Sequence, residues 1–323
     1  ALARHLETFV LWRTFLLAVG IASTGQIAAI RFAQNPIVTP ASSPTLGSNI
    51  NGPSLIRVPS WVEHPLGRYY LYFAHHGGKF IRLAYANDLS GPWRVYEPGT
   101  LRLESVRTCS DHIASPDVHI DRERRRILMY FHCPAGTAGS VDISQQKTLI
   151  ATSNDGVRFV SDTVPLGPAY FRVFHWKGFY YAIVRGGGLL RSRHPDAAFA
   201  EGPTLLPTDS GRILRHAAVD LTGNVLRVYY SRIGDRPERI LVSEVRLSND
   251  WRSWHASPPR TVLQPEHDYE GADRPLEVSQ PDDAPGRVRQ LRDPAIFKAG
   301  LRTYLLYSVA GESGIAIAEL MAR

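Results

Sequence analysis

A short structural unit recurs five times along the 323 residues of this chain, and it limits the folds that the chain can adopt. Each copy holds an apolar strand, a polar turn, an aromatic strand, a glycine-rich loop and a further apolar strand. The first two strands of the copies are Pro53–Val58 with Gly67–Ala74, Pro116–Ile120 with Ile127–His132, Tyr170–Phe174 with Gly178–Val184, His216–Leu221 with Val225–Ser231, and Pro294–Phe297 with Thr303–Ser308. The third strands are Ile81–Ala86, Thr148–Ser153, Leu189–Ser192, Ile240–Val245 and Gly314–Leu320. Helical periodicity is almost absent after residue 30, so the pattern predicts an all-β chain.

A repeat of about 55 residues has the size of one propeller blade. A four-stranded antiparallel sheet has two apolar faces, and it buries both when such sheets stack around a common axis. We therefore predict a five-bladed β-propeller, as a single domain, over residues 30–323. Arg31–Val38 precedes the first complete blade and is predicted to supply the strand that completes the last one. A β-sandwich is the alternative architecture.

The N-terminal segment has a different pattern. Arg4 and Arg13 precede an apolar run, Phe15–Ala22, and small residues follow it. This order is typical of a secretory signal, so we expect residues 1–29 to be a signal peptide or N-terminal extension, and the protein to be secreted or periplasmic. An amphipathic helix packed on the domain is the alternative. No later stretch is long and apolar enough to span a bilayer.

Cys109 and Cys133 are the only cysteines, and they flank one predicted strand pair. A single disulfide is compatible with export, and two free thiols are the alternative. Two cysteines alone do not make a metal site.

The balance of charge is basic, with 37 Lys and Arg against 30 Asp and Glu and a net charge of +7. Such a charge favours anionic partners without selecting among them. The basic residues are scattered and lack interleaved aromatics on one face, so we expect no nucleic-acid partner. No cofactor is predicted, because Arg185–Gly188 lacks the lysine of a phosphate loop. A structural calcium ion in the channel is the alternative left open, although no local acidic loop indicates one.

A propeller brings the starts of its innermost strands and the ends of its second strands together at one mouth of the central channel. The strand starts contribute Asn51 and Gly52, Ser115 and Asp117, Tyr170 and Arg172, Arg215 and His216, and Arg292 and Asp293. Polar groups that converge on a concavity are the usual candidates for a binding site. The substrate-binding candidates are Asn51, His75, His76, Lys79, His132, Arg185, Arg232, Arg292, Asp273 and Glu312.

Cleavage of a glycosidic bond normally needs two carboxylic groups on either side of the bond. The carboxylates available at this mouth are Asp117, Glu270, Asp273, Asp293 and Glu312. His216 is a further candidate acid because the ordinary pKa of an imidazole lies near 6.5.

Several segments resemble the five-bladed propeller enzymes of glycoside hydrolase family 43, the arabinanase and β-xylosidase type. The segments that carry the resemblance are Asn35–Val38, Ala84–Trp93, Ser115–Val118, Thr152–Gly156 and Arg292–Ala295. The resemblance covers roughly residues 30–320, and it implies the propeller fold and a carbohydrate substrate.

The three carboxylate positions of those enzymes are substituted here. The matching positions carry Gly52, Tyr170 and His216. Glu201-Gly202-Pro203 has the spelling of the usual acid motif, but it falls at the outer end of the third blade. Either the chemistry has moved to other side chains of the mouth, as in related propeller hydrolases of algal sugars that are thought to use a histidine acid, or the scaffold binds sugar without cleaving it.

We expect a glycoside hydrolase-like enzyme that degrades poly- or oligosaccharides at the channel mouth. Asp293 is the expected general base and His216 the acid, with Asp117 or Glu270 orienting the reacting groups. The basic candidates favour an acidic or sulfated sugar, and the alternative is that they bind uncharged sugar hydroxyls. The alternatives are a phosphorylase of similar fold, which would hold phosphate with the Arg, His and Lys side chains, and a non-catalytic carbohydrate-binding propeller.

Overall fold

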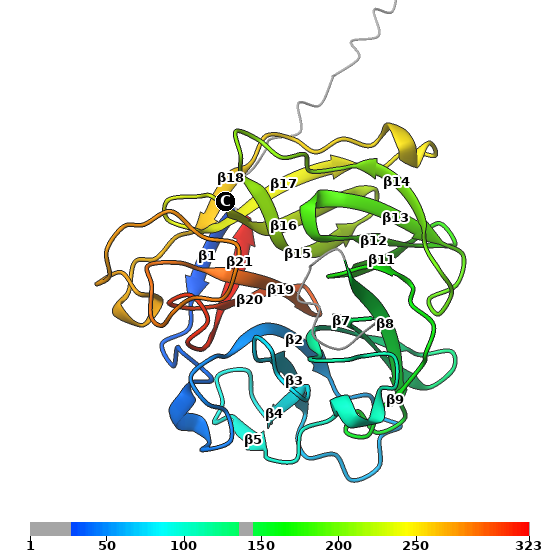
Figure 1. Ribbon diagram of the computed structural model, residues 1–323, viewed down its shortest axis with the longest axis horizontal. Helices are drawn as coiled ribbons and strands as arrows, with labels where there is room; N and C mark the ends of the chain where they lie inside the picture. Colours follow the sequence, from blue (N-terminus) through cyan, green and yellow to red (C-terminus); the bar gives the residue numbers. More distant parts are fainter. Residues whose placement is uncertain (1–26, 136–144, 323) are drawn as a thin grey trace, which may run out of the picture.

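The computed structural model describes residues 27–135 and 145–322, which form five antiparallel sheets around a central axis (Figure 1). The first sheet holds β2 (Asn51–Arg57), β3 (Tyr69–Ala74), β4 (Arg82–Ala86) and β5 (Arg94–Tyr96); the second β6 (Ala114–Asp121), β7 (Arg126–Pro134), β8 (Gln146–Ser153), β9 (Val160–Ser161) and β10 (Gly167–Pro168). The third holds β11 (Arg172–Trp176), β12 (Phe179–Ile183), β13 (Gly188–Ser192) and β14 (Ala200–Thr204); the fourth β15 (Ile213–Thr222), β16 (Val225–Ile233), β17 (Ile240–Arg246) and β18 (Arg260–Leu263). The fifth holds β19 (Arg292–Ala299), β20 (Arg302–Ser308), β21 (Ile315–Ala322) and β1 (Ile27–Arg31). The predicted five-bladed β-propeller is confirmed.

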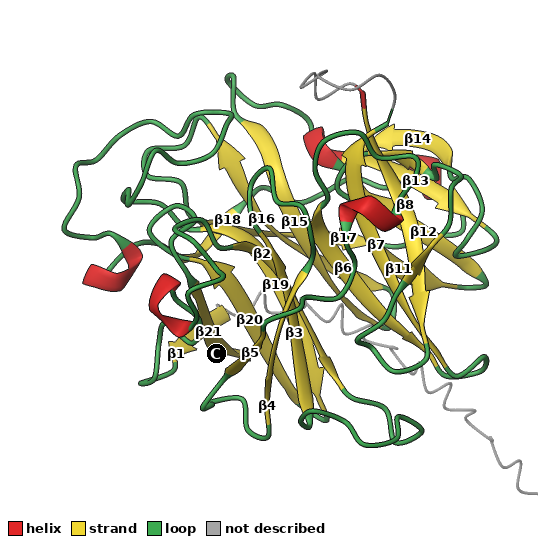
Figure 2. Cartoon of the chain, turned by 60° about the horizontal axis from the view of Figure 1, so that its bottom comes forward, coloured by secondary structure: helices red, strands yellow, loops and turns green. Residues whose placement is uncertain are grey.

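Helical structure in the described chain is limited to short 3-10 turns between strands, as Figure 2 shows. They are η1 (Pro40–Ser42), η2 (Leu103–Ser105), η4 (Arg185–Gly187), η5 (Trp251–Ser253) and η6 (Asp268–Glu270). Within the described ranges, no helix has the length and apolar character needed to cross a membrane.

The hydrophobic core consists of five clusters, and each lies between two neighbouring blades. In one of them, Tyr72 of the first blade packs with Met129 of the second. In another, Leu305 and Tyr307 of the fifth blade pack with Tyr229 of the fourth. Each sheet thus buries apolar side chains on both faces, which is the physical reason why the repeated unit forms a ring.

The ring is closed by β1, which pairs antiparallel with β21 from Ile27 opposite Ala322 to Arg31 opposite Ala318. The predicted closing segment, Arg31–Val38, is therefore placed too late in the sequence. Only Val38 of its later part forms a bridge, to Ile315. Residues 27–29, which we expected to lie outside the propeller, are part of the sheet, while residues 1–26 of the predicted leader lie outside the described residues.

Irregular backbone marks the start of the innermost strands. The register shifts in the first residues of β2, β6, β15 and β19. Ser115 and Asp293 at two of these shifts have φ of 51° and 49°, and Tyr170, just before β11, has φ of 66°. Non-glycine residues rarely adopt this left-handed conformation, which costs about 1–3 kcal/mol and often marks functional sites.

Cys109 and Cys133 form a disulfide. The prediction of a single disulfide is therefore confirmed, and the alternative of two free thiols is wrong. It ties β7 to the segment that leads into β6.

Candidate active site at the channel mouth

A cavity of about 280 Å³ opens where the five innermost strands begin. Every blade supplies a side chain to its wall, so the cavity exists only in the assembled ring. Its lining comprises Asn51, His76, Gly77, His112, Ala114, Ser115, His132, Gln146, Tyr170, Arg185, Arg215, His216, Pro281, Asp282 and Glu312.

His216 and Asp293 form a buried pair beside this cavity. The Nδ1 atom of His216 contacts Oδ1 of Asp293, whose side chain is only 2% exposed. The other carboxylate oxygen of Asp293 accepts hydrogen bonds from Ser308 Oγ at 3.0 Å and from the Gly52 backbone N–H at 3.4 Å. One oxygen of Asp293 is therefore hydrogen-bonded inside the protein and the other contacts the imidazole, and His216 is the member of the pair that lines the cavity.

The surroundings fix the protonation of the pair. Burial alone raises the pKa of Asp293, but His216, Arg215 and Arg292 lower it far more, so the pKa lies well below its ordinary value. Burial lowers the pKa of His216, and the attraction of Asp293 only partly offsets this effect. These two pKa directions give a carboxylate beside a neutral imidazole at neutral pH, and the carboxylate favours the tautomer that has its proton on Nδ1 and its lone pair on Nε2.

A layer of rings packs around His216. Its imidazole and the Tyr170 ring are perpendicular, with a centroid distance of 4.4 Å, and the centroid of His132 lies 4.2 Å from that of the same tyrosine. The guanidinium carbon of Arg185 lies 5.8 Å from the centroid of Tyr170. The Nε2 atom of His216 lies 3.4 Å from Ser115 Oγ. The cavity thus presents a mixed surface of aromatic faces and hydrogen-bonding groups.

Arg185 reaches the cavity because β12 ends in the tight turn η4. Gly187 in this turn has φ of 85°, and a Cβ atom there would lie 2.1 Å from the carbonyl oxygen of Leu206. Only glycine fits at this position, so the glycine-rich segment after Arg185 is a packing requirement that places the arginine.

A fully buried carboxylate, Glu238, supports one wall of the cavity. It accepts from Arg215 Nε at 2.9 Å and lies 3.2 Å from Arg292 Nε. Ser279 also donates to Glu238, and Arg215 donates to the Pro281 carbonyl at 2.7 Å. The two guanidinium groups are thereby fixed, together with the loop that covers them.

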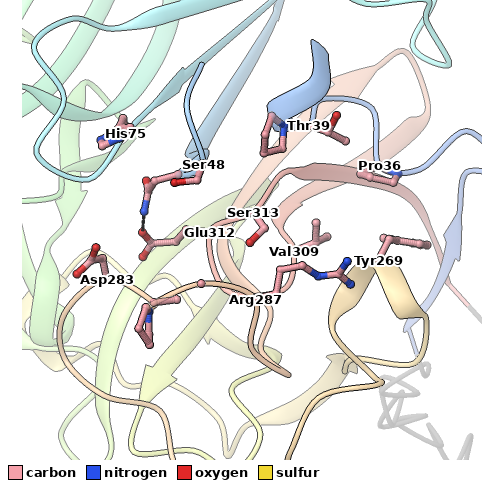
Figure 3. A pocket seen from close by; sticks show the side chains of 15 residues that line it. Pro36, Thr39, Ser48, His75, Tyr269, Asp283, Arg287, Val309, Glu312 and Ser313 are labelled. Atoms are coloured by element: carbon pink, nitrogen blue, oxygen red, sulfur yellow. Dashed lines mark hydrogen bonds between the residues drawn. The ribbon is translucent and has the colours of Figure 1, made fainter. Parts of the chain in front are cut away.

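Glu312 is held at the rim of the cavity. Its Oε1 accepts from Arg292 Nη1 at 2.9 Å, and its Oε2 accepts from Asn51 Nδ2 at 3.2 Å. His76 Nδ1 lies 3.8 Å from Oε2. Glu312 also borders a second and larger hollow of about 610 Å³, where Figure 3 shows it between His75 and Asp283. The two hollows adjoin at Glu312.

The structure brings many of the predicted site residues together. Six of the fourteen line the smaller cavity: Asn51, His76, His132, Arg185, His216 and Glu312. Asp293 and Arg292 lie directly behind it, in contact with His216 and Glu312. His75 lines the larger hollow.

Asp117 does not reach the cavity, which corrects its predicted place beside His216. It accepts from the Val173 backbone N–H at 2.8 Å and contacts His119 Nε2 at 2.9 Å. It borders a separate cavity of about 130 Å³ further along the inner strands. Ser54 makes the same kind of bond to the Val118 N–H between the first two blades, so Asp117 occupies a position that links neighbouring blades.

Glu270 also lies away from the mouth, and its side chain is fully buried. It accepts from Arg31 Nε at 2.8 Å, from Tyr307 Oη at 2.9 Å and from the Glu266 backbone N–H at 2.8 Å. The short turn η6 directs the carboxylate toward one cationic donor, Arg31 of β1, and one phenolic donor, Tyr307 of β20. We correct its expected orienting role to that of a clamp on the closing strand.

Three further candidates lie elsewhere in the fold, Lys79 and Asp273 at the surface and Arg232 in a buried position. Lys79 pairs with Asp111 at 3.1 Å, Arg232 with Asp235 at 2.9 Å and Asp273 with Arg274 at 3.1 Å. None of the three lines the 280 Å³ cavity, because each turns toward its local partner instead.

No protein-family model matches the chain. Several solved structures share its fold. CoXyl43, a family 43 β-xylosidase/α-arabinofuranosidase from a compost microbial metagenome, superposes with a TM-score of 0.61 at 14% identity, over 92% of this chain and 96% of that one. A putative glycoside hydrolase from Parabacteroides distasonis gives a TM-score of 0.64 at 12% identity, over 91% and 96%. The fold is that of the family 43 propellers.

One curated relative is similar in sequence over nearly its whole length. The uncharacterized protein R118 of Acanthamoeba polyphaga mimivirus is 36% identical over 350 aligned positions, which cover 98% of this chain and 97% of the viral protein. The chain belongs to the family of this mimivirus protein.

Sequence reasoning missed several residues of the site in this family member. Gln146 and His112 line the cavity, and Glu238 fixes its arginines. Glu238 lies in the loop before β17, away from the strand starts and ends that mark the mouth, so no local signal pointed to it. Within the described ranges, no group of three or more His, Cys, Asp and Glu side chains is arranged to hold a metal ion.

Proposed function

We propose that this protein is a glycoside hydrolase-like enzyme that binds a poly- or oligosaccharide at the channel mouth. The observation that carries the proposal is the His216–Asp293 pair, in which a buried carboxylate holds a neutral imidazole at the wall of a polar cavity. General acid–base groups are typically histidines and carboxylates whose pKa values are shifted by burial and by a charged partner.

In this proposal His216 exchanges protons with the substrate, and Asp293 positions it. The Nε2 atom accepts a proton from an attacking water and returns it to the departing sugar oxygen. This reverses part of the expected assignment, since Asp293 faces His216, Ser308 and Gly52 and not the cavity. Glu312 supplies a carboxylate for sugar hydroxyls at the rim.

The ligand we propose is an acidic saccharide. Carbohydrate binding is supported by the shared fold, because a family 43 enzyme from Xanthomonas citri with this fold was solved in complex with xylotriose. Its TM-score is 0.56 at 14% identity, over 85% of this chain and 88% of that one. Arg185 makes no ion pair with any carboxylate of the described residues and lines the cavity beside His132 and His76. A carboxylated or sulfated sugar would complement these groups.

The disulfide supports an expectation about location. Structural disulfides persist in oxidising compartments and are rare where thiols are kept reduced. We therefore propose that the propeller operates outside the reducing cytoplasm, as a secreted or periplasmic protein.

The test is incubation of the full chain with neutral, uronic and sulfated oligosaccharides, with and without phosphate, and analysis of the products by mass spectrometry. We expect a released sugar without added phosphate. Asp293→Asn should lower turnover about 10²–10⁴-fold because His216 loses its anionic partner. Asparagine tolerates the left-handed backbone of this position, so the fold should survive.

Asp273→Asn is the matched control, since Asp273 is a surface carboxylate in a local ion pair. It should turn over like the unmodified protein. Equal activity of the two variants would remove Asp293 from the mechanism, and binding without any product would favour a non-catalytic propeller.

A further inference from the structure

Three side chains from three different blades lie in a row across the channel mouth. Ser115 Oγ lies 3.4 Å from His216 Nε2, and His216 Nδ1 contacts the carboxylate of Asp293. A hydroxyl, an imidazole and a carboxylate in this order form the arrangement that activates a serine in unrelated hydrolases, where it is identified by geometry and not by sequence order. Distances from nucleophile to base are often longer in ligand-free structures than in complexes.

The protonation states of Asp293 and His216 are those that a base acting on a serine hydroxyl requires. Asp293 is ionised and fixes the proton of His216 on Nδ1, so the lone pair of Nε2 faces the hydroxyl of Ser115. The other nearby serine, Ser308, donates to Asp293 from the opposite side and does not contact the imidazole. Ser115 is therefore the hydroxyl that this base can deprotonate.

The backbone also sets Ser115 apart. It lies in a register shift between Ala114 and Asp117, with φ of 51°, and it lines the cavity. Its neighbour across the blade boundary is Gly52, where an added Cβ would lie 3.8 Å from Ser115 Oγ. Gly52 therefore puts no side chain of its own beside the hydroxyl, and the Cβ of Ala74 lies 3.9 Å from the point that an added Cβ would occupy. A strained backbone at a residue that lines a cavity often marks a functional site.

We propose that Ser115 is the nucleophile of a second hydrolytic activity at this mouth, the cleavage of acyl esters carried on a bound saccharide. The sugar as alcohol component rests on the function proposed above, whereas the acyl transfer rests on the Ser115–His216–Asp293 geometry alone. Arg185 and His132 line the same cavity and are the candidate donors for the oxygen of the reacting carbonyl.

The reaction proceeds in two balanced steps. Ser115 Oγ attacks the ester carbonyl carbon while its proton passes to His216 Nε2. The bond to the sugar oxygen breaks, and that oxygen leaves as a hydroxyl with the proton from His216. Water then attacks the acyl-serine, gives a proton to Nε2, and releases the carboxylic acid as the proton returns to Ser115.

A fluorophosphonate probe tests the nucleophile without knowledge of the substrate. We expect one probe molecule per chain, located on Ser115 by peptide mass spectrometry. Ser115→Ala should abolish labelling. Asp293→Asn and His216→Gln should slow it about 10²–10⁴-fold. Ser90→Ala, at a half-buried serine outside the cavity lining and bonded to Asp88, is the control and should label at the unmodified rate.

Turnover is measured as acetate released from acetylated xylo-oligosaccharides and from p-nitrophenyl acetate. Ser115→Gly is the second variant, because glycine adopts the left-handed backbone freely and should fold. It should release no acetate above background while its melting temperature stays near that of the unmodified protein.

The outcomes separate the two proposals. Labelling of Ser115 and ester cleavage in the absence of any sugar binding would support the acyl transfer and contradict the saccharide function. Sugar cleavage with no label on Ser115, or acetate release by Ser115→Gly, would overturn the acyl transfer and leave the saccharide function standing.

Discussion

His132 is a buried imidazole in the wall of the site. It is 2% exposed, and its Nδ1 has no hydrogen-bond partner among the described residues. Burial lowers its pKa well below the ordinary value, and the nearby His112, His216 and Arg172 lower it further. The folded protein therefore holds His132 in its neutral form.

Acidification should consequently weaken the fold before any carboxylate titrates. Below about pH 6.5 a histidine in the unfolded chain binds a proton, whereas the same histidine in the folded protein stays neutral. The free energy of unfolding therefore decreases as the pH falls below that value. His132, His216 and His75 all have lowered pKa values and act in this window. We expect the melting temperature to fall between pH 7.5 and pH 5 in differential scanning fluorimetry.

The variant His132→Gln should show a smaller fall over the same range, and replacement of the exposed His255 by Gln is its control. Identical pH profiles for the two variants would mean that His132 does not contribute to the acid sensitivity.

Among the elements, the strands were predictable and their irregular ends were not. Apolar and aromatic runs predict Ile127–His132 inside β7 and Leu189–Ser192 inside β13. A blade is buried on both faces, so each of its strands is rich in apolar and aromatic residues. The register shifts at Ser115 and Asp293 depend on contacts with neighbouring blades, so a local pattern does not reveal them. The pairing of His216 with Asp293 follows from topology once the blades are counted, whereas the burial of Glu270 depends on Arg31, far away in the sequence.

The clamp on β1 gives a prediction at this scale. Glu270→Gln removes a buried charge that accepts from Arg31 and Tyr307, and we expect a loss of about 2–4 kcal/mol in the free energy of unfolding. Glu266→Gln is the matched control: this half-exposed carboxylate contacts the same arginine, and its loss should cost at most about 1 kcal/mol. Chemical denaturation measures both.

Activity should survive Glu270→Gln in the fraction of protein that remains folded. If Glu270→Gln were inactive while its stability was unchanged, Glu270 would have a catalytic role after all.

For the whole molecule, the disulfide adds a covalent cross-link within the packing between the first two blades, where Cys133 is buried and Cys109 packs against the same cluster. Cys109 and Cys133 are 24 residues apart, and closure of a loop of this size contributes about 2–4 kcal/mol in the chain-entropy account. A reductant should therefore lower the melting temperature by several degrees. The double variant Cys109→Ser, Cys133→Ser should melt lower from the start and should not respond to reductant. A response of that variant would show that the reductant acts elsewhere.

The pairing of β1 with β21 has a consequence for the order in which the protein is made. Arg31 lies opposite Ala318, so β1 cannot pair until almost the whole domain has been synthesised. At ordinary translation rates this delay is roughly 15–60 s. The carboxylate that holds His216 also belongs to the last blade. A nascent chain on the ribosome therefore carries the imidazole without its partner, and the protein becomes competent for proton transfer only when the last blade has emerged and the ring has shut.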